Sequence, residues 1–382
     1  MRRRAFLHSG LAATAAAAAG TLIPDLARGA RAPHTLPGRH PAPRQDGVLR
    51  LNSNENALGP AESARRAIID GIDESNRYTH PVVAELRPIL AAHHEVEKSS
   101  VVLGNGSTEL LRMTVQAMVP SGGRVVVADP TFEHVERYAV PFGLDVVKVP
   151  LTHDHAHDLD RMRDAVRPAG PALVYICNPN NPTGSLTPSR DVEAWIREER
   201  DDVVFLVDEA YFEYVDHPAY RSVLPLALQR PNVVVIRTFS KIYGLAGLRI
   251  GYGLAHPALA RRVAAFSGFS NMNQMGLRAA RACLGDAGWL ERSLGANEEA
   301  RRIAYDVLDE LGLERIPSHT NFVMHRVPGD VSDYIRHMAE HGVRVGRPFP
   351  PMTGHNRLSF GLPGQMERFA EVLRRGRREG WV

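Results

Sequence analysis

The sequence predicts an α/β fold in which helices cover both faces of a parallel β-sheet. Short runs of apolar, often β-branched residues recur after residue 100, without the polar alternation of a half-exposed strand. Stretches with helical periodicity, such as residues 191–199, lie between these runs, which is the order expected of a layered α/β domain. The four clearest runs are 124–128, 173–177, 203–207 and 233–237.

The composition indicates a soluble globular protein with a sizeable core. Of the 382 residues, 44% are hydrophobic and 23% are charged, and the net charge is +3. The arginines are scattered rather than clustered, so we expect no nucleic-acid partner, and the basic stretch 374–378 is expected to be a solvated helix face. The histidine-rich segment 153–158 is expected to be a solvated loop rather than a metal site.

Residues 1–32 are typical of a secretory signal peptide. A basic head, Arg2-Arg3-Arg4, precedes an apolar stretch at 11–23 and a small-residue end, Ala30-Arg31-Ala32. Arg3-Arg4 followed by Phe6-Leu7 resembles the twin-arginine export signal, a route that carries folded proteins. We therefore expect export to the periplasm or beyond, a cytoplasmic location if the segment is not processed, and no membrane contact by the mature chain. A tail or a misassigned start remains the alternative.

The pattern changes near residue 275, where long helical stretches begin to dominate. Helical periodicity at 288–312 and 331–341 is accompanied by short strand candidates at 321–325 and 357–360. We therefore predict an N-terminal arm, a large domain and a small α+β domain. Their bounds are 33–58, 59–275 and 276–382. The two cysteines, Cys177 and Cys283, lie in apolar runs and are expected to be buried free thiols.

Side chains that could contact a ligand follow the four predicted strands at their carboxyl ends, where open parallel sheets bind ligands. Phe132 follows the first strand, Asn181 the second, Asp208 and Tyr211 the third, and Lys241 the fourth. One edge of the sheet should therefore carry an aromatic ring, an amide, a carboxylate with a phenol, and an amine. Each residue alone has an ordinary explanation as a cap, turn, core or surface residue; the set is specific.

That set matches the needs of pyridoxal-5′-phosphate (PLP). An amine must form an imine with the PLP aldehyde, and a carboxylate must keep the pyridine nitrogen protonated. The ring oxygen needs hydrogen-bond donors, and the ring face needs an aromatic partner. The phosphate is best held by backbone N–H groups at the start of a helix together with an arginine. No step of this chemistry requires a metal ion.

Several motifs resemble those of fold-type I PLP enzymes, and among these the histidinol-phosphate aminotransferase-like family. The matching segments are 51–56, 104–109, 180–184, 208–211 and 240–241 with 247–249, and the resemblance covers roughly residues 48–375. It implies a large domain with a mostly parallel seven-stranded sheet between helices, plus a smaller α+β domain.

The resemblance also implies a role for each candidate residue. Lys241 would hold PLP as a Schiff base and later move the substrate proton, while Asp208 would pair with the ring nitrogen. Asn181 and Tyr211 would donate to the ring oxygen, and Phe132 would stack on the ring.

The phosphate and substrate sites follow in the same way. The phosphate would be bound by Ser107, Thr108, Thr238, Ser240 and Arg249. Tyr78 would reach the phosphate of a second subunit, which implies a homodimer. Arg357 would bind the substrate α-carboxylate, and Asn181 would also contact the substrate.

The implied activity is transfer of an amino group between an amino acid and a 2-oxo acid. A PLP-dependent lyase or decarboxylase of the same fold remains the alternative. Two departures from the family pattern bear on the distal end of the substrate: no tyrosine precedes Tyr78, and Gly346 stands before Arg347 where relatives carry arginine directly after the strand. The donor is therefore left open between histidinol phosphate and another amino acid.

Overall fold

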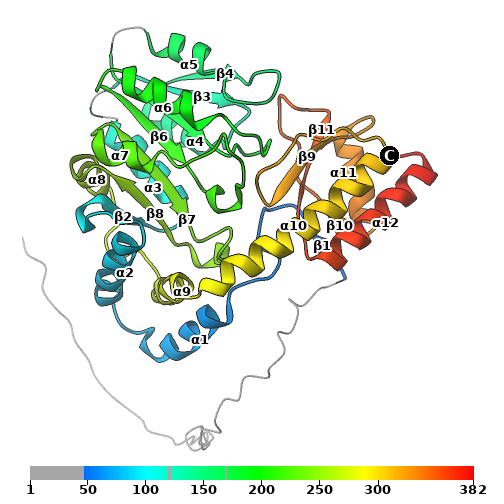
Figure 1. The fold of residues 1–382 in the computed structure, drawn as a ribbon, viewed down its shortest axis with the longest axis horizontal. Coiled ribbons are helices and arrows are strands. Elements are labelled where there is room, and N and C mark those ends of the chain that lie inside the picture. Colours follow the sequence, from blue (N-terminus) through cyan, green and yellow to red (C-terminus); the bar gives the residue numbers. More distant parts are fainter. Residues whose placement is uncertain (1–46, 119, 121, 168–169) are drawn as a thin grey trace, which may run out of the picture. The chain divides into compact units, whose positions relative to one another are not determined.

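A seven-stranded sheet lies at the centre of the fold in the computed structural model, which describes residues 47–118, 120, 122–167 and 170–382. The strand order is β2-β8-β7-β6-β5-β3-β4, and every neighbouring pair is parallel except the two that include β8 (Figure 1). This confirms the predicted fold class. The strands are β2 (Val101–Gly104), β3 (Arg124–Asp129), β4 (Asp145–Pro150), β5 (Ala172–Cys177), β6 (Val203–Asp208), β7 (Val233–Thr238) and β8 (Gly251–Ala255).

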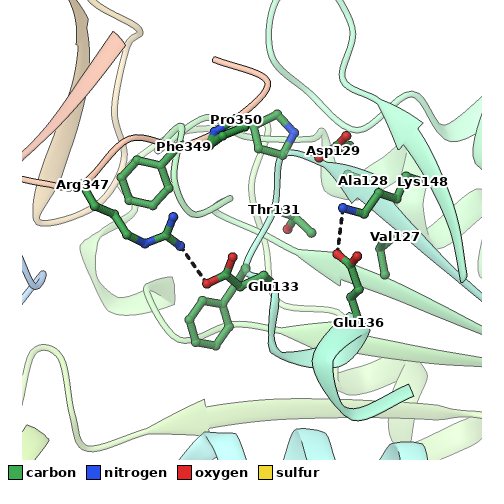
Figure 2. Close-up of a pocket in the computed structure, with 12 residues that line it drawn as sticks. Val127, Ala128, Asp129, Thr131, Glu133, Glu136, Lys148, Arg347, Phe349 and Pro350 are labelled. Carbon is green, nitrogen blue, oxygen red and sulfur yellow. Dashed lines mark hydrogen bonds and ion pairs between the residues drawn. The ribbon is translucent and has the colours of Figure 1, made fainter. Parts of the chain in front are cut away.

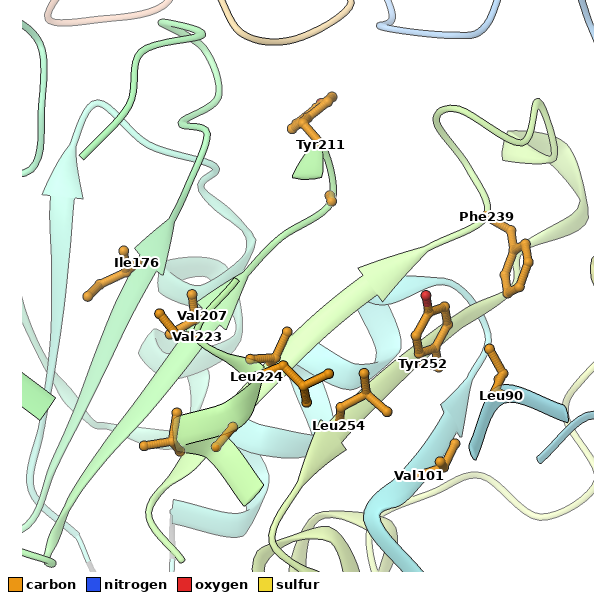
Figure 3. Packing of buried hydrophobic residues seen from close by; sticks show 14 of the residues in the cluster. Leu90, Val101, Ile176, Val207, Tyr211, Val223, Leu224, Phe239, Tyr252 and Leu254 are labelled. Atoms are coloured by element: carbon orange, nitrogen blue, oxygen red, sulfur yellow. The ribbon is translucent and has the colours of Figure 1, made fainter. Parts of the chain in front are cut away.

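The four predicted runs are β3, β5, β6 and β7, which are neighbours in the sheet. Side chains alternate between its two faces, so that Val203 and Phe205 enter one core while Val204 and Leu206 enter the other. Figure 3 shows part of the first core. Burial on both faces explains why these strands are apolar throughout, and it brings their carboxyl ends to one edge.

Helices cover both faces of this sheet. The helices that contribute to the first core are α1 (Glu62–Gly71), α2 (His80–His93), α5 (Leu159–Val166), α6 (Ser189–Glu198), α7 (Leu224–Gln229) and α9 (Gln274–Leu284). The helices that contribute to the second core are α3 (Ser107–Met118), α4 (His134–Ala139) and α8 (Pro257–Ala264). Short 3-10 segments are η1 (Ile72–Glu74), η2 (Lys98–Ser100), η4 (Val140–Phe142), η5 (Phe212–Tyr214) and η6 (Ala246–Leu248).

A third core lies in the C-terminal part of the chain and includes Leu49 and Leu51 from the N-terminal arm. Helix α10 spans two cores, because Trp289 packs in the first and Ala300 in the third. Helices α10 and α12 lie side by side (Figure 1). The elements here are β1 (Leu49–Arg50), α10 (Ala287–Glu310), β9 (Phe322–Arg326), α11 (Val331–Glu340), β10 (Val343–Arg344), β11 (His355–Ser359) and α12 (Pro363–Glu379). β9 pairs with β11 antiparallel, and β1 with β10 parallel.

The remaining expectations have mixed outcomes. Cys177 and Cys283 are free and buried, as predicted. Within the described ranges, no helix is long and apolar enough to cross a membrane, and no cluster of metal-ligating side chains is found. The predicted signal peptide, residues 1–32, lies outside the described residues.

Candidate active site

Asp208 is a buried carboxylate at the end of β6. Its Oδ2 accepts from the hydroxyl of Tyr175 at 3.0 Å, and its Oδ1 accepts from the backbone N–H of Ala210 at 3.1 Å. Burial raises the pKa of Asp208 to about 6, although these hydrogen bonds and the charge of Lys241 oppose the rise. Both contacting groups are uncharged, so neither of them neutralises the charge of the carboxylate, which a cationic partner could do.

Lys241 lies three residues beyond β7 and faces the same space. Its Nζ donates to the backbone oxygen of Asn54 at 3.2 Å and stands 5.3 Å from the ring centroid of Tyr211. Burial lowers the pKa of Lys241 to about 8, and the positive charge of Arg357 adds to this effect. A larger share of neutral amine near pH 7 makes Nζ a better nucleophile and proton acceptor.

Arg357, on β11, reaches Asn181 from the C-terminal part of the chain. Its Nη1 donates to Oδ1 of Asn181 at 2.6 Å and its Nη2 donates to the backbone oxygen of Asn52 at 3.1 Å, while Nε is buried without a partner. Burial lowers the pKa of Arg357 to about 10. Because Asn181 accepts through Oδ1, its Nδ2 is free to donate, as the predicted contact with the PLP ring oxygen requires.

Asn54 is a site residue to which the sequence analysis gave no role. Its Nδ2 donates to the Tyr211 hydroxyl at 3.1 Å, and its Oδ1 accepts from Ser359 at 2.9 Å. Asn54 is buried and has φ 53°, a left-handed conformation that asparagine tolerates better than most residues. Its membership of the asparagine-rich motif at 51–56 was the available signal. Tyr175, which donates to Asp208, could not be recognised as a site residue from the sequence, because it lies within an apolar strand.

The predicted phosphate-binding residues converge at the start of α3. Arg249 donates through Nη2 to Oγ1 of Thr108 at 2.8 Å and through Nη1 to Oγ of Ser240 at 3.2 Å, and Thr238 donates to Ser240 at 2.9 Å. Ser107 opens the helix, whose first N–H groups have no intrahelical acceptor. A Cβ on the preceding Gly106 would collide with the Arg249 guanidinium, so glycine keeps this cradle open.

Phe132 lies beyond β3, and its ring stacks on His134 with centroids 4.2 Å apart and an interplanar angle of 18°. One face of Phe132 is therefore backed by an imidazole that the sequence analysis did not identify. Tyr78 is not brought into this cluster: it is 79% exposed, and the neighbouring ring is that of His80. The predicted role of Tyr78 needs a second subunit.

A buried ion pair fixes the strand ends that carry these residues. Glu209, which follows Asp208, accepts from Nη2 of Arg237 at 2.8 Å, and both side chains are almost completely buried. Arg237 directly precedes Thr238 of the phosphate cradle. The pair therefore ties the end of β6 to the end of β7.

The residues present fit PLP. Among the residues that the structure describes, no cation contacts the buried carboxylate of Asp208 and no acceptor contacts the amide N–H₂ of Asn181, while Lys241 provides an amine of lowered pKa. Arg249 and the start of α3 form an anion cradle of a size that only glycine at 106 permits. The fold and this site define a fold-type I PLP-dependent enzyme.

Comparison with known proteins identifies the family. Residues 46–373 match the model of aminotransferase class I and II. The chain is 35% identical over 330 residues to the histidinol-phosphate aminotransferase of Bacillus velezensis, and the match covers 85% of this chain and 91% of that protein. The chain belongs to the class I and II aminotransferase family, and it is a PLP-dependent aminotransferase.

Solved structures agree with this assignment. A putative histidinol-phosphate aminotransferase from Erwinia carotovora atroseptica has a TM-score of 0.86 and 36% identity, over 89% of this chain and 99% of that one. The histidinol-phosphate aminotransferase of Sinorhizobium meliloti, solved in complex with PLP, has a TM-score of 0.78 and 31% identity, over 86% and 91%. PLP is the cofactor of this chain, as predicted; the individual residue roles remain predictions.

Proposed function

We propose that this aminotransferase uses an α-amino acid as donor and a 2-oxo acid as acceptor, and that Arg357 binds the α-carboxylate of both. The observation that carries the proposal is the state of Arg357. Its guanidinium is buried beside Lys241, and in the described part of the chain it contacts an amide and a backbone oxygen rather than a carboxylate. A substrate carboxylate would supply the charge that this buried cation lacks.

The chain's own groups account for the proton transfers. PLP, when bound, supplies an electron sink for the negative charge that develops at the substrate Cα. Lys241 Nζ takes the Cα proton and returns it on the cofactor side, a role that suits an amine whose pKa is near 8. Asp208 would keep the ring nitrogen of PLP protonated, and Asn181 and Arg357 would orient the substrate.

Histidinol phosphate is the second candidate donor, because the relatives named above carry the name of the enzyme for that substrate. It has no α-carboxylate, so its phosphate would have to occupy Arg357 instead. The displaced Arg347 and the absence of a tyrosine before Tyr78 favour another amino acid over it.

A screen of amino donors tests the proposal. Each amino acid, and histidinol phosphate, is mixed with the PLP-loaded protein, and conversion of the bound cofactor to its amino form is followed by absorbance. We expect α-amino acids to convert it and Arg357→Met to raise their KM strongly. If no amino acid converts the cofactor while histidinol phosphate does, the proposed donor class is wrong. Release of carbon dioxide would instead support a decarboxylase.

We also propose that the chain works as a homodimer in which Tyr78 binds the PLP phosphate of the other subunit. Tyr78 and Phe269 are 79% and 93% exposed, and His80 lies between them, with ring-centroid distances of 6.2 Å and 5.7 Å. Exposed aromatic groups gathered in this way are typical of an interaction surface.

Finally, we propose that residues 1–32 direct export by the twin-arginine route. The support is the paired Arg3-Arg4 before an apolar stretch and a small-residue end. Replacing both arginines with lysine should keep the full-length chain in the cytoplasm, as measured by cell fractionation. Equal export of this variant and the native chain would contradict the proposal.

A further inference from the structure

A crevice next to the active site is lined by two ion pairs. Arg347 donates to Glu133 at 2.8 Å, and Lys148 pairs with Glu136 at 2.9 Å (Figure 2). Phe132 and Phe349 also line this crevice. Phe132 is the predicted aromatic partner of the cofactor ring, so the crevice borders the space in which the substrate would lie.

Arg347 is a second guanidinium close to that of Arg357 in space. The Phe349 ring lies against both, with its centroid 4.5 Å from Cζ of Arg357 and 4.3 Å from Cζ of Arg347. Gly346, which directly precedes Arg347, donates its N–H to the backbone oxygen of Arg357 at 2.9 Å. A substrate bound through Arg357 therefore has a second cation close to its far end.

Glu133 neutralises that second cation. Its Oε1 accepts from Nη2 of Arg347 at 2.8 Å and also from Nη2 of Arg137 at 2.7 Å. An anionic substrate side chain would have to displace Glu133 from Arg347 or lie beside its negative charge, and both cost free energy. Apart from the two ion pairs, the side chains that line the crevice are uncharged except that of Asp129, whose carboxylate adds a further negative charge. His134, whose pKa burial lowers, stacks on the lining residue Phe132.

We propose that Glu133 is a specificity-determining residue: by occupying Arg347 it favours substrates with an uncharged side chain over isosteres with an anionic one. The inference rests on the proposed function, because it takes Arg357 as the α-carboxylate site. It assigns the donor class as amino acids whose side chain carries no net charge, and Phe132 and Phe349 are the aromatic groups that such a side chain would meet in the crevice.

The test compares two donors that differ only in charge at the far end, glutamate and glutamine. We expect Glu133→Gln to raise the ratio of kcat/KM for glutamate over glutamine by about tenfold, mainly through KM, because Arg347 is then free to bind the side-chain carboxylate. Arg347→Gln should lower the ratio, and adding Glu133→Gln to it should restore little. Glu136→Gln removes a carboxylate from the same crevice without freeing Arg347, and it should change the ratio less than twofold.

A binding measurement gives the same comparison without turnover. Glutarate and its monoamide, glutaramate, are titrated into the PLP-loaded protein by calorimetry, and Glu133→Gln should tighten glutarate binding selectively. An unchanged ratio in Glu133→Gln, or an equal change in Glu136→Gln, overturns the inference. Failure of the proposed function looks different: the native enzyme would then convert neither glutamine nor any other amino acid.

Discussion

Lys241 is the residue whose replacement should separate chemistry from folding most cleanly. Its Nζ makes one hydrogen bond, to a backbone oxygen, and it carries a desolvation cost, so Lys241→Ala should change the free energy of unfolding by no more than about 1 kcal/mol. Loss of the proton-transferring amine should lower kcat by at least about 10²–10⁴-fold. Borohydride reduction followed by peptide mapping should label Lys241 in the native chain and leave the variant unlabelled.

The matched control for that experiment is Lys148→Ala. Lys148 lies in the neighbouring crevice and pairs with Glu136, and its removal should leave both the label and the turnover number intact. Cofactor label recovered on Lys148 in the native protein would show that the assigned lysine is wrong.

The raised pKa of Asp208 predicts how the free energy of unfolding depends on pH. Burial raises this pKa from an ordinary value of 3.8 to about 6 in the folded, cofactor-free chain, so between these limits the folded chain binds more protons than the unfolded chain. Stability contributed by this group is therefore present below pH 4 and is lost as the pH rises through 6, by roughly 3 kcal/mol. Asp208→Asn should remove the loss.

The measurement is the free energy of unfolding of cofactor-free protein in urea, at several pH values from 4.5 to 7.5. The difference between variant and native chain isolates Asp208 from the buried His157 and His325, whose pKa burial lowers to about 4 and which therefore also make stability depend on pH. Asp333→Asn, at an exposed helix position, should follow the native curve. If the protonated ring nitrogen of bound PLP pairs with Asp208, as predicted, the native slope should shrink with PLP bound; a slope that persists would argue against that pairing.

At the scale of elements, the approach of β8 to the start of α3 should control cofactor affinity. Gly251 of β8 packs directly on the backbone of Gly106 and Ser107, so a Cβ at this position would push the helix away from Arg249. Gly251→Ala should weaken PLP binding about tenfold and destabilise the fold by about 1–3 kcal/mol. Gly253→Ala is the control on the same strand, because its Cβ would meet Leu110 at an ordinary 3.6 Å.

The comparison is made by titrating each cofactor-free variant with PLP and following absorbance. Equal affinities for the two alanine variants would show that the phosphate cradle tolerates movement of α3. Because both substitutions lie in one short strand, a general loss of strand stability would affect both alike, whereas the predicted effect belongs to Gly251.

The elements also show why some of the structure was predictable and some was not. β3, β5, β6 and β7 were found because burial on both faces leaves an apolar run. β8 was missed because two of its five residues are glycine, which disfavours strands. β4 was missed because it is an edge strand in which one residue is buried and the others are exposed or partly buried.

The same reasoning holds for the site. Lys241, Asp208 and Arg249 belong to local motifs, so their positions could be predicted from spacing. Asn54 and Tyr211 are 157 residues apart in sequence, and their hydrogen bond exists only because the N-terminal arm folds back over the sheet edge. The position of His134 behind Phe132 depends on the conformation of the turn that contains both residues. No feature of the sequence predicted this stacking.

At the scale of the whole molecule, one subunit leaves the site incomplete if Tyr78 acts across an interface. The phosphate cradle of this chain contains Arg249, Thr108 and Ser240, whereas Tyr78 is exposed beside Phe269. The proposed dimer would cover these aromatic rings and bring each Tyr78 to the partner's phosphate. Sedimentation should then give twice the mass of the chain, and Phe269→Glu should shift it toward the monomer.

Mixing two impaired variants tests whether Tyr78 acts in the partner. Lys241→Ala removes the amine from its own site, and Tyr78→Ala should weaken PLP binding and turnover in both sites of its own dimer. In a hybrid dimer, the site that retains Lys241 belongs to the Tyr78→Ala subunit, and it receives an intact Tyr78 from the Lys241→Ala subunit. One complete site is thereby restored, so unfolding and refolding the two variants together should give more turnover than the sum of the two variants refolded separately. If Tyr78 served the site of its own chain, every site in the hybrid would lack either the amine or the phenol, and mixing would recover nothing.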